Sequence, residues 1–170
     1  MRHIIGILLQ NESGALGRVA GMFSSRAYNI ESLSVAPTDD PTVSRLTLVT
    51  RGSEAVIQQI ASQLKKLIDV VSVEDMTRGE HIERELVLLK LRVDPARQDL
   101  VRGFITRMGG RVLDPSSSSF IVELLGSEAE INGFMQELSA HAEFIEVVRS
   151  GALGISRSAH ALHLVETAAP

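Results

Sequence analysis

Residues 11–17 (Asn-Glu-Ser-Gly-Ala-Leu-Gly) are the part of the sequence whose residue types and spacing suggest chemistry. They form a polar, glycine-containing turn between an apolar strand, residues 3–9, and an amphipathic helix. The first turn of a helix leaves backbone N–H groups without intrahelical partners, and these groups attract small anions such as an amino-acid carboxylate. The segment therefore indicates a receptor site for a small ligand rather than a catalytic centre.

The individual residues of this turn suit a zwitterion. Gly14 lets a ligand approach the backbone closely, and the amides near Gly14, Ala15 and Leu16 would hold a carboxylate. The side chain of Asn11 offers an acceptor for an ammonium group. The simpler interpretation is an ordinary strand-to-helix turn with a helix cap, and the residue chemistry alone favours it because such turns are common.

Asn29 lies where the first helix should end, and it also has two interpretations. As a structural residue it would adopt the left-handed conformation that closes a helix. As a functional residue it would offer its side-chain amide to the charged groups of a ligand. Considered without a family, the structural role is the simpler one.

Charge and composition exclude several classes of function. The chain has 170 residues and a net charge of −4; residues 1–78 carry eight positive and eight negative groups, so the acidic excess lies in residues 79–170. Neither half has the basic face that nucleic-acid binding requires. The absence of cysteine excludes disulfides and thiolate metal sites. We expect no nucleic-acid partner and a cytoplasmic location.

Motifs for other chemistry are missing as well. The spacing Gly14-x-x-Gly17 matches neither a dinucleotide fingerprint nor a phosphate-binding loop. The five histidines are scattered, so we predict neither a metal site nor catalytic residues. The apolar run at residues 4–9 is too short to span a membrane, and we interpret it as a buried strand.

The order of elements repeats along the chain, which is the strongest architectural signal. The first half predicts a buried strand, a helix, a hairpin, a second helix capped by Ser53 and a final strand. The apolar positions that should face the sheet from the first helix are Leu16, Val19, Ala20, Phe23 and Ala27, and the predicted strands are residues 4–9, 30–36, 43–51 and 70–76.

The second half predicts the same order. Asp94-Pro95 begins a helix that Gly109-Gly110 ends, and Ser127 with Glu130 forms a capping box for the next helix. The expected strands are residues 86–93, 111–114, 120–125 and 144–148, with a turn at 115–119, and the buried helix positions are Leu100, Val101, Phe104, Ile105, Met108, Ile131, Phe134, Met135 and Leu138.

The fold class follows from this repetition. We predict an α+β protein of two ferredoxin-like βαββαβ domains, each an antiparallel sheet with both helices on one face. The domains are residues 1–78 and 79–157, and residues 158–170 form a tail. The segment from Gly151 to Pro170 has no sustained period, and we expect it to be partly mobile. A domain of this size with an uncovered sheet edge also favours oligomerisation.

Several co-linear motifs resemble the regulatory (small) subunit of acetolactate synthase, also called acetohydroxyacid synthase. The resemblance extends over about residues 1–157, which makes it far more specific than any short pattern. The matching segments are Asn11–Leu16 with Arg18, Val19, Phe23 and Arg26, Tyr28–Leu33, Ala36–Pro41 with Ser44, Arg45 and Thr47, His81–Leu86, and Arg149–Gly151.

The resemblance implies that the first domain is an ACT domain that binds valine between the two chains of a homodimer. The positions that carry over as the valine site are Asn11, Gly14, Ala15, Leu16, Asn29 and Ile30. It further implies a non-catalytic subunit that activates the large catalytic subunit and confers valine feedback inhibition in branched-chain amino-acid biosynthesis. Thiamine diphosphate, magnesium and FAD are then expected in the partner catalytic subunit and no cofactor in this chain.

Two other classes of function compete with this interpretation. A free-standing amino-acid sensor that acts on a transcription factor or an unrelated enzyme would share the same features. An RNA-binding module is suggested by the Gly14-x-x-Gly17 spacing, because GXXG loops clamp nucleic-acid backbones. That kind of loop needs basic neighbours, and only Arg18 is near.

Overall fold

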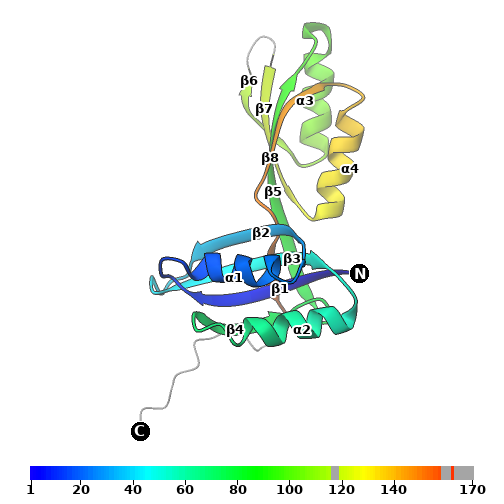
Figure 1. The fold of residues 1–170 in the computed structure, drawn as a ribbon. Helices are drawn as coiled ribbons and strands as arrows, with labels where there is room; N and C mark the ends of the chain where they lie inside the picture. Colours follow the sequence, from blue (N-terminus) through cyan, green and yellow to red (C-terminus); the bar gives the residue numbers. More distant parts are fainter. Residues whose placement is uncertain (116–118, 158–161, 163–170) are drawn as a thin grey trace. The chain divides into compact units, whose positions relative to one another are not determined.

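The computed structural model describes residues 1–115, 119–157 and 162, and it consists of two compact units. The first unit contains Met1–Glu83 together with the described residues from Ala152 onward, and the second contains Arg84–Gly151 (Figure 1). The first unit is therefore built from both ends of the chain, whereas the sequence suggested consecutive domains at residues 1–78 and 79–157.

The first unit has the predicted βαββαβ order. Its sheet runs β2-β3-β1-β4, and all neighbouring strands are antiparallel. The two helices pack on one face of this sheet (Figure 1). The elements are β1 (Arg2–Gln10), α1 (Ala15–Ser24), β2 (Ile30–Pro37), β3 (Val43–Arg51), α2 (Glu54–Leu64) and β4 (Val70–Asp75).

The face of α1 that packs on the sheet differs from the predicted face. The buried residues of α1 are Ala15, Val19, Met22 and Phe23, so Val19 and Phe23 are confirmed. Leu16 is 38% exposed, and Ala20 is exposed too. Ala27 lies beyond the helix, which ends at Ser24. The helix begins directly after Gly14, and this start turns Ala15 rather than Leu16 toward the core.

The second unit repeats the topology, with the sheet order β6-β7-β5-β8. The cap at Asp94 and the capping box of Ser127 and Glu130 are confirmed, and Gly109 ends α3 with φ +83°. Leu100, predicted to be buried, is exposed, because α3 turns Val101, Phe104 and Ile105 to the core. The elements are β5 (His81–Arg92), a 3₁₀ turn (Pro95–Arg97), α3 (Gln98–Arg107), β6 (Arg111–Pro115), β7 (Ser119–Gly126), α4 (Glu128–Leu138) and β8 (Glu143–Arg149).

The chain returns to the first unit after β8, which the sequence did not predict. We call residues 152–157 the strap; they include a further strand, β9 (Leu153–Ser156), which pairs with β5. The strap lies over the face of the first sheet that the helices leave open, where Ala152 packs with Ile4, Val49 and Met76. Within the segment from residue 151 that we expected to be partly mobile, the strap packs on the first sheet. The expected tail, residues 158–170, lies outside the described residues except for Leu162.

Backbone groups of the strap bond to side chains of the sheet. Ala152 donates its N–H to Ser32 Oγ at 2.9 Å, and Gly154 donates its N–H to Thr47 Oγ1 at 3.4 Å. Arg45 Nη2 donates to the carbonyl oxygen of Gly154 at 3.3 Å. A Cβ atom at Gly154 would lie 2.8 Å from side-chain atoms of both Ile4 and Met76. Glycine therefore allows the strap to lie this close to the sheet.

Gly154→Val should destabilise the first unit, because its side chain would have to displace Ile4 and Met76. We expect a loss of about 1–3 kcal/mol, the usual cost of overpacking, measured by urea unfolding. Gly79→Val is the matched control, since a Cβ atom there meets nothing within 4 Å. Equal stability of the two variants would contradict this role of Gly154.

Candidate functional site

The loop between β1 and α1 is held against the β2–β3 connection by Asn11. The Asn11 backbone N–H donates to the Thr42 carbonyl at 2.7 Å, and its side-chain Nδ2 donates to the Pro41 carbonyl at 2.9 Å. Because the amide nitrogen faces Pro41, the side-chain oxygen faces away from it. Among the described residues no hydrogen bond occupies this oxygen, so it is an available acceptor for an ammonium group.

Gly14 is the N-cap residue of α1 and has φ +86° and ψ −11°. L-residues with a β-carbon rarely adopt this left-handed conformation, so the turn requires glycine or, at some cost, Asn or Asp. The Ala15 N–H donates to the Glu12 carbonyl at 3.2 Å and is therefore already used by the turn. The first intrahelical donor is Arg18, whose N–H bonds to the Gly14 carbonyl at 2.9 Å.

The amides available to a ligand therefore differ in part from those predicted. Helix geometry leaves the N–H groups of Leu16 and Gly17 without intrahelical acceptors, while that of Ala15 is bonded within the loop. The first turn of α1 carries no acidic side chain that would compete for these donors. The N-terminus of α1 thus has the character of an anion site. This site is centred slightly further along the helix than the sequence suggested.

An ion pair beside Gly14 was not predicted from the sequence. The Arg18 guanidinium reaches across the loop to the carboxylate of Asp69, with Nη2 to Oδ1 at 2.8 Å and a second hydrogen bond from Nε to Oδ2. Asp69 has a side chain only 4% exposed, whereas Arg18 is about half exposed. A Cβ atom at Gly14 would lie 3.0 Å from Arg18 Nη1, so the guanidinium lies directly beside the turn. The two partners are 51 positions apart, and no local pattern links them.

The ion pair changes the titration of both groups. The hydrogen bonds from Arg18 hold the pKa of the Asp69 carboxyl below its ordinary value, although its desolvation opposes this shift. The same hydrogen bonds raise the pKa of the Arg18 guanidinium. Both groups therefore remain charged near neutral pH, and Asp69 neutralises the positive charge that Arg18 brings to the turn.

Asn29 and Ile30 lie at the opposite end of α1 from Gly14. The helix between them has 10 residues, which corresponds to about 15 Å at 1.5 Å per residue. Asn29 is exposed, and its carbonyl accepts a hydrogen bond from Thr50 Oγ1 at 2.6 Å. Ile30 begins β2 and is partly buried against the core. The structure therefore places the predicted site residues in two groups that one chain does not bring together.

The predicted left-handed residue after α1 is wrong. Ala27, with φ +55°, is the non-glycine residue with positive φ in the described chain, and Asn29 is not. The Tyr28 N–H then bonds back to the Phe23 carbonyl at 3.0 Å, so the chain reverses two residues earlier than a cap at Asn29 would require. The side chain of Asn29 is consequently not needed to close the helix.

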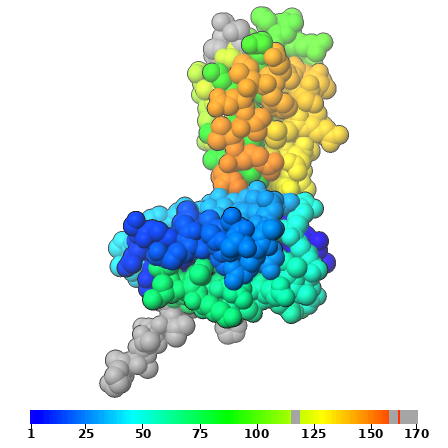
Figure 2. All heavy atoms as spheres, viewed as in Figure 1, coloured from blue at the N-terminus to red at the C-terminus, as the bar shows by residue number. Residues whose placement is uncertain are grey.

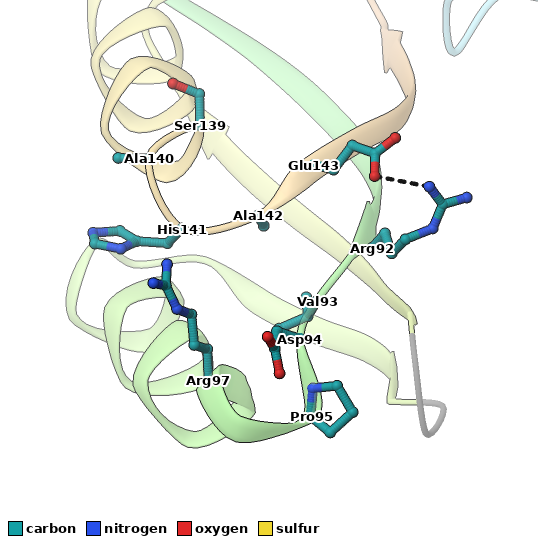
Figure 3. Close-up of a pocket in the computed structure, with 10 residues that line it drawn as sticks. All are labelled: Arg92, Val93, Asp94, Pro95, Arg97, Ser139, Ala140, His141, Ala142 and Glu143. Atoms are coloured by element: carbon teal, nitrogen blue, oxygen red, sulfur yellow. Dashed lines mark hydrogen bonds and ion pairs between the residues drawn. The ribbon is translucent and has the colours of Figure 1, made fainter.

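A pocket in the second unit is lined by residues from the end of β5 to the 3₁₀ turn and from the end of α4 to the start of β8 (Figure 3). Its polar residues mostly have structural partners: Arg92 pairs with Glu143 at 2.8 Å, and Asp94 caps the 3₁₀ turn. The side chain of Arg97 extends toward His141 in Figure 3.

No group of three or more histidine, aspartate or glutamate side chains in the described part of the chain is arranged to hold a metal ion. Likewise, none of the described helices is long and apolar enough to cross a membrane.

Comparisons with known proteins show the family of this chain. A family model described as AHAS small subunit-like ACT domain matches residues 5–72, and one described as small subunit of acetolactate synthase matches residues 84–158. The chain belongs to the acetolactate synthase small-subunit family. Its first unit is an ACT domain, and the predicted α+β class is confirmed.

Relatives of the family match over nearly the whole chain. The acetolactate synthase isozyme 3 small subunit of Escherichia coli is 46% identical over 157 residues, which are 92% of this chain and 96% of that protein. The acetolactate synthase small subunit of Haemophilus influenzae is 44% identical with the same coverage. The crystal structure of the small subunit from Thermotoga maritima has a TM-score of 0.83 at 29% identity, covering 93% of this chain and 98% of that one.

Asp69→Asn should remove a pH-dependent part of the stability. The folded-state pKa of Asp69 lies below its unfolded value of about 3.9, so its contribution is complete above that pH and is lost as the pH falls through the folded value. We expect wild type to exceed Asp69→Asn in urea midpoint at about pH 6 and the difference to shrink below about pH 4. Asp39→Asn, at an exposed turn position, is the control. A difference independent of pH would contradict this role of the pair.

Proposed function

We propose that this chain is a regulatory subunit that binds L-valine between two copies of its ACT domain and transmits valine occupancy to the large catalytic subunit of acetolactate synthase. The observation that carries the proposal is the separation of the predicted site residues into two groups at opposite ends of α1. One small ligand touches both groups only if each comes from a different copy.

The topology of the sheet provides such an arrangement. β2 is a terminal strand of the sheet and has eight residues, so its outer edge offers backbone groups with which a second copy would pair. β1 and β2 are both antiparallel to β3, so they run in the same direction and end at the same side of the unit. Asn11 is bonded to Pro41 and Thr42 at that side.

A two-fold axis between the β2 strands of two copies would then complete the site. Antiparallel pairing of the whole strand places Ile30 of the second copy opposite Pro37. Asn29 and Ile30 of one copy thereby approach the end of the other at which Asn11 and Gly14 lie. The interface is isologous, so a dimer has two equivalent sites. α1 lies on the surface of the first unit, where a second copy has access to it (Figure 2).

The groups at this junction complement each part of valine. The N–H groups of Leu16 and Gly17 suit its carboxylate, and the Arg18 guanidinium lies beside Gly14. The side-chain oxygens of Asn11 and Asn29 suit the ammonium group. The exposed part of Leu16 and the side chain of Ile30 offer an apolar surface for the isopropyl group. A methylene group changes such binding by only about 1–3 kcal/mol, so leucine and isoleucine should compete weakly.

The partner and the reaction follow from the family. Because the relatives are named as small subunits, we propose that the large catalytic subunit is the partner of this chain in the cytoplasm and itself binds thiamine diphosphate, magnesium and FAD. Valine would favour one arrangement of the small-subunit dimer, and with it a less active state of the enzyme. The size of the inhibition is limited by the difference in valine affinity between the two arrangements.

Gly14→Asp should abolish valine inhibition of the reconstituted enzyme, whereas Gly14→Asn should retain most of it. Both substituted residues must adopt the same left-handed backbone conformation, so the two variants differ chiefly in the charge of the side chain. The aspartate would repel the valine carboxylate and attract Arg18. We expect the valine concentration for half inhibition to be about tenfold higher or more for Gly14→Asp than for Gly14→Asn. A tenfold difference corresponds to about 1.4 kcal/mol of binding free energy. Acetolactate formation is the readout, and equal sensitivity of the two variants would exclude this end of α1 as the carboxylate site.

Val35→Glu should dissociate the dimer and remove valine inhibition with it. Val35 lies on β2 and is 39% exposed, and its position would be covered by a second copy. A buried, unpaired carboxylate opposes association. Ile68→Glu is the matched control, because Ile68 is 87% exposed and lies away from β2. Light scattering should show a smaller particle for Val35→Glu alone; a dimer that survives this substitution would argue against pairing along β2.

A further inference from the structure

A second pocket lies in the first unit, between α2 and the helix-covered face of the sheet. It is lined by residues from three places: β1 contributes His3, α2 and its cap contribute Ser53, Ile57 and Ala61, and the end of β4 contributes Asp75 with the nearby Thr77. None of the residues predicted to bind valine lines this pocket. Its chemistry therefore needs a separate explanation.

His3 forms the polar floor of the pocket. Residues Ile5 and Ile7 of β1 pack under the helices, so the alternation of the strand turns His3 to the same face. His3 is 4% exposed, and neither of its ring nitrogens has a hydrogen-bond partner among the described residues. A neutral imidazole carries one donor and one acceptor, and leaving such groups buried and unpaired is costly. A polar group in the pocket would satisfy them.

The mouth of the pocket presents both signs of charge. Ser53 caps α2 by accepting the Val56 N–H, and because Ser53 and Glu54 both line the pocket, the N-terminus of α2 opens into it. The helix end favours a carboxylate there. Asp75 lies opposite Ile5 in the sheet register and so shares the face of His3. One of its carboxylate oxygens accepts the Thr77 N–H at 3.0 Å, and its remaining acceptor capacity suits an ammonium group.

The remaining wall is apolar and narrow. Ile57 is buried and Ala61 is small and half-buried, so together they leave room for a short alkyl group. A simple anion in this pocket would face Asp75 and Glu54, and a simple cation would face the end of α2 and Arg78, which pairs with Glu54. A molecule with both charges close together avoids both conflicts.

We propose that this pocket binds a free amino acid with a small apolar side chain, as a site distinct from the one between two ACT domains. The carboxylate lies at the N-terminus of α2, the ammonium group lies at Asp75, and the side chain contacts Ile57 and Ala61. A ring nitrogen of His3 forms a hydrogen bond with the charged groups of the ligand. Occupancy of the pocket depends on one chain only, so it does not require the dimer.

The ring nitrogens of His3 report directly on this pocket. The full chain, labelled with ¹⁵N-histidine, would be titrated separately with glycine, L-alanine, L-valine and L-leucine, and the signals that disappear in His3→Gln identify His3. We expect a saturable shift of the His3 signals with at least one of these amino acids. Ala61→Trp, which fills the pocket, should weaken that binding about tenfold or more. Ala61→Leu fills less of the pocket and tests the same point with a smaller side chain.

Two controls separate this site from the proposed valine site. Ala55→Trp makes the same substitution on an exposed position of α2 outside the pocket and should leave the His3 response unchanged. Gly14→Asp should also leave it unchanged, because Gly14 is not part of this pocket. The proposal is overturned if no amino acid shifts the His3 signals, which would leave only water as the occupant. It is also overturned if the response survives both Ala61 substitutions, or if Gly14→Asp removes it.

Discussion

A ten-residue helix separates the two halves of the proposed valine site, and the role of the first unit depends on this separation. The turn at Gly14 and the chain reversal at Ala27 lie at its two ends, and both positions have positive φ. A single chain therefore presents half a site at each end of α1. In the proposed dimer, two chains related by a two-fold axis would complete both sites at once, so ligand binding and association would become one equilibrium. Such a coupling allows a small molecule to alter the arrangement of a much larger assembly.

The surroundings of α1 restrain the turn that begins it. Asn11 ties the loop to the β2–β3 connection, and Arg18 ties the helix to Asp69, which precedes β4. The Asp69 carbonyl also accepts the Gln10 N–H at 2.8 Å, at the end of β1. The donors at the start of α1 are thus positioned by three strands before any ligand arrives. Binding to a preorganised turn costs less conformational entropy than binding to a mobile one.

Much of the fold could be predicted from the sequence because its signals are local. Alternating apolar residues marked the strands, and Ser53, Asp94 and the Ser127–Glu130 pair marked helix starts that the structure confirms. The same local reasoning chose the wrong face at Leu16 and Leu100. In both helices the observed buried stripe shares residues with the predicted one and is rotated slightly from it, a difference that periodicity alone does not resolve.

The features that escaped prediction are contacts between distant parts of the chain. The strap joins Ala152 to Ser32, and Arg18 pairs with Asp69, which lies 51 positions later in the sequence. No role for His3 could be assigned from the sequence, because the residues of α2 and Asp75 that line the same pocket come from distant parts of the chain. Gly154 carried a weak signal, since a glycine in an extended segment often marks a close approach. For the proposed valine site, the residue types suggested a zwitterion and the family resemblance implied a position between two chains. The length of α1 adds a physical reason for that proposal.

The most direct test of this need is the dimer dissociation constant measured with and without valine by sedimentation equilibrium on the isolated chain. If each valine requires both chains, linkage predicts that valine at about ten times its dissociation constant lowers the dimer dissociation constant by about a hundredfold, since two sites form per dimer. A dimer dissociation constant that does not change at saturating valine would contradict the account, because each chain would then bind valine equally well alone.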